Sequence, residues 1–258
     1  MGAVSTPVPP PPPHAPHLPP PPPPGPARAS RTGPGFWWRV LSPVGAVLVA
    51  LVVLVALAGV LAAAGVGDDA LGATVTFTSS LLLLCFGVAL WRMLPRAERR
   101  VVLAPKRSRV GAVLLGLNVG AGIVIGGVAI IALGQLVEPG VEDRLEDVQR
   151  ELGAAPWQVA RIVVSLVVLA PLGEELLFRG LLLRGLVRRM RFPFAAVLSG
   201  TLFAAAHADA YVIWPRAIAL VITGAVLAWL YRWRGYPASV AAHFTVNAVA
   251  AVALAATS

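Results

Sequence analysis

The stretch VVSLVVLAPLGEELLFRGLLL, residues 163–183, decides how this chain folds. It is long and apolar enough to cross a bilayer as a helix, which takes about 20 residues. Yet Glu174, Glu175 and Arg179 stand in its middle. Ionisable side chains inside a span are costly, and they face a cavity or one another. The stretch therefore predicts a membrane helix that carries a polar site.

The composition of the whole chain is that of a membrane protein. Hydrophobic residues make up 57% of the 258 residues and charged residues only 13%, whereas soluble domains carry about 25% charged residues. Apolar segments lie at about 44–66, 73–94, 110–137, from 157 into 181–191, 194–207, 214–231 and 238–256. We expect an all-α polytopic transmembrane bundle of about seven spans.

The N-terminal part differs in character from the rest. Residues 1–35 hold 15 of the 24 prolines, and such a tract favours polyproline II because it lacks the apolar residues of a core. We expect a disordered proline-rich tail, with a ligand for proline-binding domains as the alternative. The rest divides into N-terminal transmembrane helices and loops over 36–150 and a catalytic core over 151–258. The one cysteine, Cys85, excludes an intrachain disulfide.

The charges of the loops predict an orientation. The link 95–109 is rich in Lys and Arg, whereas the link 138–151 is rich in acids. Lys and Arg are enriched in cytoplasmic loops, so the basic link and the N-terminus are expected in the cytoplasm of a bacterial cell, with the chain in the plasma membrane. The net charge of +9 belongs to these loops, and no basic stripe with interleaved aromatics suggests nucleic acid. A GxxxG at Gly122 and Gly126 predicts a helix-packing surface.

Three short motifs hold most polar groups of the later spans: E-E-x-x-x-R at 174–179, F-x-x-x-H at 203–207 and H-x-x-x-N at 243–247. A four-residue spacing puts two side chains on one helix face, so Glu175 can pair with Arg179. The turn near 191–193 makes the fourth and fifth segments a hairpin. Counting 1.5 Å per residue from that turn places Glu174 and His207 at similar depth. We expect the three motifs to meet.

These residue types together point to hydrolysis of an amide bond inside the membrane. A carboxylate can act as a general base toward water. Two imidazoles with a carboxylate can hold a zinc-like metal and acidify its water. An asparagine amide or a protonated histidine can stabilise an oxyanion through hydrogen bonds.

In this order on successive late segments, the three motifs resemble the CPBP family of intramembrane metalloproteases. This family includes type II CAAX prenyl endopeptidases and Abi-like bacteriocin-processing or immunity proteins. The resemblance covers about residues 150–250. It implies an α-helical intramembrane endopeptidase with a cavity open to the cytosol. The substrate would be a membrane-associated protein or peptide, either a prenylated, CAAX-like one or one without a prenyl group, and the bilayer itself would be the other partner.

The resemblance also implies roles for single residues. Glu174 would activate water as the general base, with His207 beside it. His243 and Asn247 would stabilise the tetrahedral oxyanion. Phe203 is expected to pack and to shape the wall of the substrate pocket.

Two further implications concern the remaining charges and the cofactor. Glu175 and Arg179 would form a structural pair that orients the catalytic residues. The metalloprotease label would make Glu174, His207 and His243 the ligands of a divalent metal such as zinc, whereas a glutamate mechanism needs no bound ion.

Two other classes of function fit part of the pattern. A non-enzymatic membrane factor for immunity or secretion could use the same fold. A proton-coupled transporter could relay protons through buried acids and histidines, but paired broken helices in two halves, which many transporters have, are missing from the sequence.

Overall fold

Helices make up every regular element of the residues described by this computed structural model, which are 34–141, 143–144 and 156–257. No strand occurs within these ranges. The predicted all-α fold is thereby confirmed. The predicted tail lies outside the described residues except for Pro34 and Gly35, so its character stays a prediction, as does the division into three regions.

Among the described residues, four helices are long and apolar enough to cross a bilayer: α1 (Phe36–Ala63), α2 (Asp68–Arg92), α4 (Arg109–Val137) and α10 (Trp214–Arg234). The chain is thus an integral membrane protein by length and composition of its helices. The last helix, α11 (Tyr236–Thr257), has 22 residues, but α9 (Phe192–Ala205) has only 14. At 1.5 Å per residue α9 is about 21 Å long, less than the roughly 30 Å of a hydrocarbon core. The predicted fifth span is therefore too short to cross that core by itself.

One helical run, residues 156–186, alternates between α and π geometry. It consists of α6 (Pro156–Val164), the π segment η1 (Ser165–Leu169), α7 (Ala170–Glu174), the π segment η2 (Glu175–Leu183) and α8 (Arg184–Leu186). Pro171 accounts for η1, because its ring has no N–H and crowds the carbonyl four residues earlier, so the preceding turn widens. Such π turns are rare and concentrate at functional sites.

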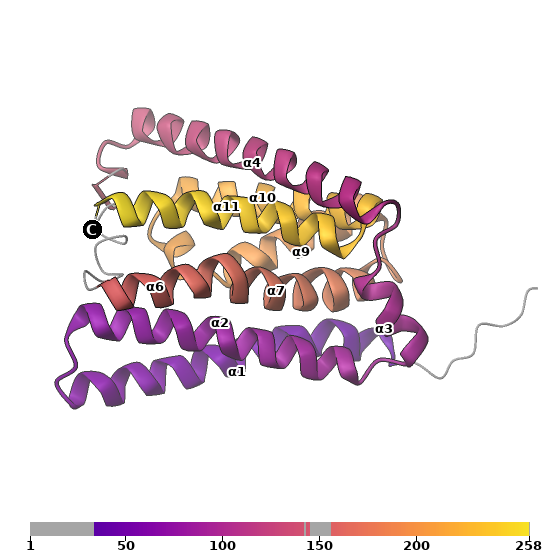
Figure 1. Cartoon of the computed structure of the whole chain (residues 1–258), viewed down its shortest axis with the longest axis horizontal. Coiled ribbons are helices and arrows are strands. Elements are labelled where there is room, and N and C mark those ends of the chain that lie inside the picture. The colour runs from indigo at the N-terminus through magenta and orange to yellow at the C-terminus, as the bar shows by residue number, and fades with distance from the viewer. Residues whose placement is uncertain (1–33, 142, 145–155, 258) are drawn as a thin grey trace, which may run out of the picture. The chain divides into compact units, whose positions relative to one another are not determined.

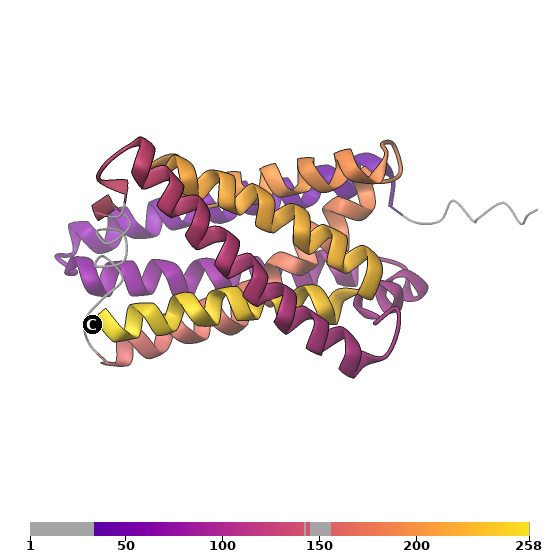
Figure 2. The ribbon, with the colours of Figure 1, turned by 90° about the horizontal axis from the view of Figure 1, so that it is seen from above.

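This run lies in the interior of the bundle. The helix α2 packs along α6, η1 and α7, while η2 contacts α1, α9 and α11. Figure 1 shows α6 and α7 between α2 on one side and α11 on the other. Figure 2 shows α4 crossing obliquely over α10 and α11. Every residue of η2 is buried, so the charges of the central motif lie inside the protein.

A short amphipathic helix in the basic link was not expected from the sequence. It is α3 (Arg96–Leu103), whose Val102 is buried while Arg96 and Arg100 are exposed. The indole of Trp91 at the end of α2 donates a hydrogen bond to the Arg99 carbonyl at 3.2 Å. The link is therefore folded against the bundle.

Glycines allow the closest helix contacts around the central run. A Cβ on Gly173 of α7 would lie 2.6 Å from the backbone nitrogen of Leu84 on α2. A Cβ on Gly200 of α9 would lie 2.5 Å from the Val221 carbonyl oxygen on α10. Both distances are far below van der Waals contact, so glycine is required at each crossing.

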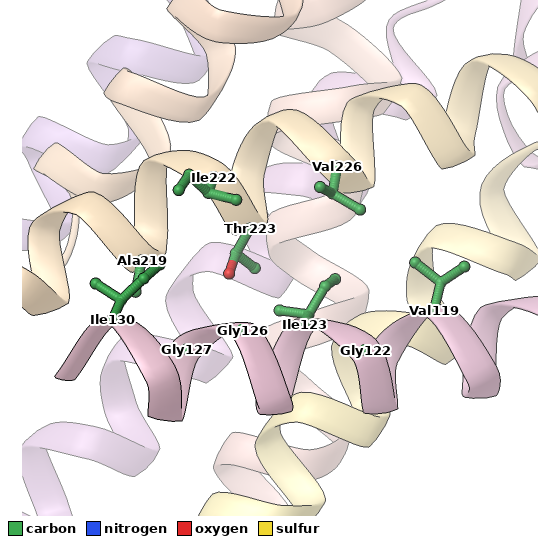
Figure 3. A pocket seen from close by; sticks show the side chains of 10 residues that line it. All are labelled: Val119, Gly122, Ile123, Gly126, Gly127, Ile130, Ala219, Ile222, Thr223 and Val226. Atoms are coloured by element: carbon green, nitrogen blue, oxygen red, sulfur yellow. The ribbon is translucent and has the colours of Figure 1, made fainter. Parts of the chain in front are cut away.

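The predicted packing role of Gly122 and Gly126 is wrong. A Cβ on either would meet no atom within 4 Å. Together with Gly127 they line an apolar hollow of about 330 Å³ between α4 and α10 (Figure 3). The α4 glycines that do touch a neighbouring helix are Gly116 and Gly120, which face α11, and Gly134, which faces Pro215 of α10.

This contrast between glycines yields a stability prediction. Gly200→Ala forces α9 away from α10, and overpacking of this kind costs about 1–3 kcal/mol. Gly122→Ala adds the same methyl group to open space, so it is neutral or gains about 1 kcal/mol of helix propensity. Thermal unfolding of both variants in detergent measures the difference. Equal midpoints would show that α9 and α10 do not cross at Gly200.

Candidate active site

Glu175 is a fully buried carboxylate with three side-chain partners, one on its own helical run and two on α11. Its Oε1 lies 3.0 Å from Nη1 of Arg179 and 3.2 Å from Nδ1 of His243, and its Oε2 accepts a hydrogen bond from the Ser239 hydroxyl. A buried charge is stable only when it is paired and hydrogen-bonded. Glu175 meets that condition, and its oxygens are therefore occupied.

Arg179 connects the central run to two other helices. Its side chain is fully buried, and Nη2 donates to the Gly224 carbonyl on α10 at 3.1 Å. Its guanidinium also lies 4.7 Å from the ring centroid of Phe203 on α9, a distance typical of a cation–π contact. The Glu175–Arg179 pair expected from the four-residue spacing is present, and it serves as an anchor between helices.

His243 on α11 lies between the two acids. Because the Glu175 carboxylate accepts, Nδ1 carries the shared proton, and the other ring nitrogen, Nε2, is directed at Glu174. Nε2 is 3.8 Å from Glu174 Oε2, which is too long for a hydrogen bond. The His243 ring is thus held in place through Nδ1, and Nε2 is the nitrogen that faces the site.

Glu174 differs from its neighbour in having a carboxylate oxygen without a partner. Its Oε2 is buried and accepts no hydrogen bond from the described residues. Burying an ionisable group without such a bond is unfavourable. The acid next to a fully paired Glu175 is therefore the one available to bind water or substrate.

Phe203 places the second imidazole near the first. Its ring centroid is 4.7 Å from that of His207 and 5.6 Å from that of His243. His207 follows the end of α9, just before the short 3-10 helix η3 (Ala208–Tyr211). Its Nδ1 donates to the Phe203 carbonyl at 2.8 Å, so Nε2 is the nitrogen left to act. The structure thus brings the F-x-x-x-H motif against the other two.

Asn247 makes a contact that the sequence did not predict. Its Nδ2 donates to the Leu166 carbonyl of η1 at 2.7 Å. The amide therefore braces the π segment, and its expected part in oxyanion stabilisation stays a prediction.

Two further side chains contact the site or its helical run without having been singled out by the sequence motifs. Ser239 contacts Glu175, and the Tyr236 hydroxyl donates to the Leu172 carbonyl at 2.8 Å. Ser239 could have been found, because Ser239, His243 and Asn247 follow one another at four-residue steps and so share a helix face. Nothing in the spacing singles out Tyr236.

The predicted metal ligands are not arranged as a ligand set. Within the described part of the chain, no three His, Cys, Asp or Glu side chains are close enough together to hold one ion. His207 and His243 both lie against the ring of Phe203, and Glu174 lies 3.8 Å from His243 Nε2, but the three side chains do not form a group that could hold one ion. A bound divalent metal such as zinc stays a prediction.

Comparison with protein families found one match. Residues 156–249 match the family model described as type II CAAX prenyl endopeptidase Rce1-like. The match spans all three motifs and confirms the family resemblance seen in the sequence. Searches of curated proteins and of solved structures gave no significant match.

Proposed function

We propose that the chain hydrolyses a peptide bond of a membrane-associated protein or peptide, because residues 156–249 match the family model described as type II CAAX prenyl endopeptidase Rce1-like. A prenylated, CAAX-like carboxyl terminus is the substrate class that the family name suggests. One observation carries the proposal: Glu175 is fully paired, whereas Glu174 has a buried oxygen that accepts no hydrogen bond from the described residues and lies near His243 Nε2.

In the proposed reaction Glu174 is the general base. Its carboxylate takes one proton from a water molecule as the water oxygen attacks the carbonyl carbon of the scissile bond. The resulting tetrahedral oxyanion accepts a hydrogen bond from Nε2–H of His243 in its doubly protonated form, whose Nδ1–H remains on Glu175. The Asn247 N–H that is not donated to Leu166 would supply the second hydrogen bond. When the carbon–nitrogen bond breaks, the protonated Glu174 returns its proton to the leaving amine. No step requires a metal ion.

The surrounding residues would hold these groups in position. Glu175 fixes the His243 ring through Nδ1, and Arg179 fixes Glu175 to α10 and α9. Phe203 would form the wall between the two imidazoles and contact the substrate. His207, half-buried at the end of α9, would assist the base. Reacting groups held this way need little rearrangement during catalysis.

The charges of the described loops support a cytoplasmic N-terminus. The link between α3 and α4 and the turn before α9 carry many Lys and Arg residues, and such loops remain in the cytoplasm. Pro34, the first described residue, accepts hydrogen bonds from Arg39 and Arg188. The start of α1 is therefore held at this same basic end.

The proposal is tested by comparing membrane and secreted peptides from cells that carry the wild-type chain or Glu174→Gln. We expect at least one cleavage product that only the wild type generates, and its ends would identify the substrate and the scissile bond. If every phenotype of the gene is retained by Glu174→Gln and no product is lost, the chain is a non-enzymatic scaffold.

A further inference from the structure

Three cations from separate elements meet at the basic end of the bundle. Lys106 belongs to the link between α3 and α4, Arg184 begins α8, and Arg232 lies in the last turn of α10. Lys106 Nζ donates to the Arg232 carbonyl at 2.6 Å, and Arg184 lies near the side chain of Tyr231, the residue before Arg232. Partial desolvation, followed by the charges of Arg232 and Arg184, lowers the pKa of Lys106. The Lys106 side chain is therefore in contact with the end of α10, and Arg184 is near enough to act on its charge.

No described acid forms an ion pair with any of these three cations. Glu98 of α3 forms ion pairs with Arg39 at 2.6 Å and with Arg188 at 3.7 Å. Glu175 forms its ion pair with Arg179, inside the bundle. The Nε atom of Arg184 is buried and has no hydrogen-bond partner among the described residues. The cluster thus has positive charge and donor capacity that the protein itself leaves unused.

The link that carries Lys106 is held in place by backbone contacts. Lys106 N donates to the Arg234 carbonyl at 3.1 Å, and Pro105 forms an antiparallel bridge with Gly235. Gly235 has φ +88°, and a Cβ there would meet the Ala104 carbonyl oxygen. A site held this way loses little conformational freedom when an anion binds.

Aromatic residues place the cluster at the membrane surface. The Arg232 guanidinium lies 4.6 Å from the ring centroid of Phe192. The Phe192 ring stacks edge-on against Trp229, which in turn stacks on the exposed Trp233. Tryptophan is enriched at the level of lipid headgroups. At that depth the abundant anion is a phospholipid headgroup, and basic pockets between helices bind such groups.

We propose that Lys106, Arg184 and Arg232 bind the phosphate of an anionic phospholipid. The lipid would link α3–α4, α8 and α10, and so stabilise the end of the run that carries Glu174. This site is distinct from the peptidase site and does not depend on the proposed reaction.

Thermal unfolding of the purified full chain in neutral detergent tests the site. Short-chain phosphatidylglycerol, phosphatidylcholine or inorganic phosphate is added in separate titrations at equal ionic strength. We expect only phosphatidylglycerol to raise the midpoint. Lys106→Gln and Arg184→Gln should each need about fivefold more of it for the same shift, given the usual contribution of one cation near an anionic surface.

Two further variants make the result decisive. Arg107→Gln removes an exposed neighbouring charge and should change the required lipid concentration by less than about twofold. Arg232→Gln alters an exposed side chain, so it reports on the site even if Arg184→Gln fails to fold. If phosphatidylglycerol raised the unfolding midpoint equally in all variants, general surface charge would explain the effect, and the proposal would be overturned. Equal stabilisation by inorganic phosphate would overturn the assignment to a lipid.

Discussion

Glu174→Gln should reduce kcat for a cleaved reporter peptide by about 10²–10⁴-fold, the usual contribution of a general base. Glutamine keeps the size of the side chain but cannot take a proton from water. Because Glu174 Oε2 accepts no hydrogen bond from the described residues, the substitution breaks no described hydrogen bond of that atom. We therefore expect an unfolding midpoint within a few degrees of the wild type. Steady-state kinetics and thermal unfolding on the same preparation measure both quantities.

Glu175→Gln provides the matched control one position away. This change removes a charge from the contacts with Arg179, His243 and Ser239, so it should lower stability as well as activity. The general base is the glutamate whose replacement lowers activity without lowering stability. Full activity of Glu174→Gln in a folded protein would contradict the mechanism, and a larger loss of stability at Glu174 than at Glu175 would reverse the two assignments.

Arg179→Met should be the most destabilising substitution of those considered. It leaves the Glu175 charge fully buried without its cation, and breaking a buried ion pair costs about 3–5 kcal/mol. It also removes the hydrogen bond to the Gly224 carbonyl and the contact with Phe203. For a protein of this size the loss corresponds to a midpoint lower by roughly 10 °C. Thermal or denaturant unfolding in detergent gives the value.

A double variant separates the ion pair from the rest of the site. Replacing both partners, as in Glu175→Leu with Arg179→Met, removes the uncompensated charge, and such replacements are often neutral or stabilising. We expect it to recover much of the stability lost in Arg179→Met. Activity should stay low, because His243 has then lost the acid that holds Nδ1. Similar stability for the single and double variants would show that the pair contributes no electrostatic stabilisation.

Local features of the site were predictable from the sequence because they involve side chains four residues apart on the same helix. The spacing of Glu175 and Arg179 gave their ion pair, and the spacing of Phe203 and His207 put the two rings in contact. Apolar runs of span length predicted the membrane helices, because a chain in lipid must satisfy its backbone hydrogen bonds within a helix. The three family motifs could also be recognised in the sequence, because each spans only five or six consecutive residues.

Contacts between distant segments depended on packing. Ser239, His243 and Glu175 meet although more than sixty positions separate the helices, and Asn247 turned out to hold η1 through Leu166. The hydrophobic periodicity of a sequence does not show which side chains of two distant helices contact each other. The π geometry of η1 and η2 was likewise not predicted from the sequence.

The glycines show most clearly where sequence and tertiary structure divide. The sequence by itself determined that the chain forms apolar membrane helices with one polar centre, because burying charges in lipid is costly. It could not tell Gly122 from Gly200, since lipid-facing and helix-facing surfaces are equally apolar in a membrane. Only the tertiary structure decided that Gly200 sits at a helix crossing and Gly122 in an open hollow.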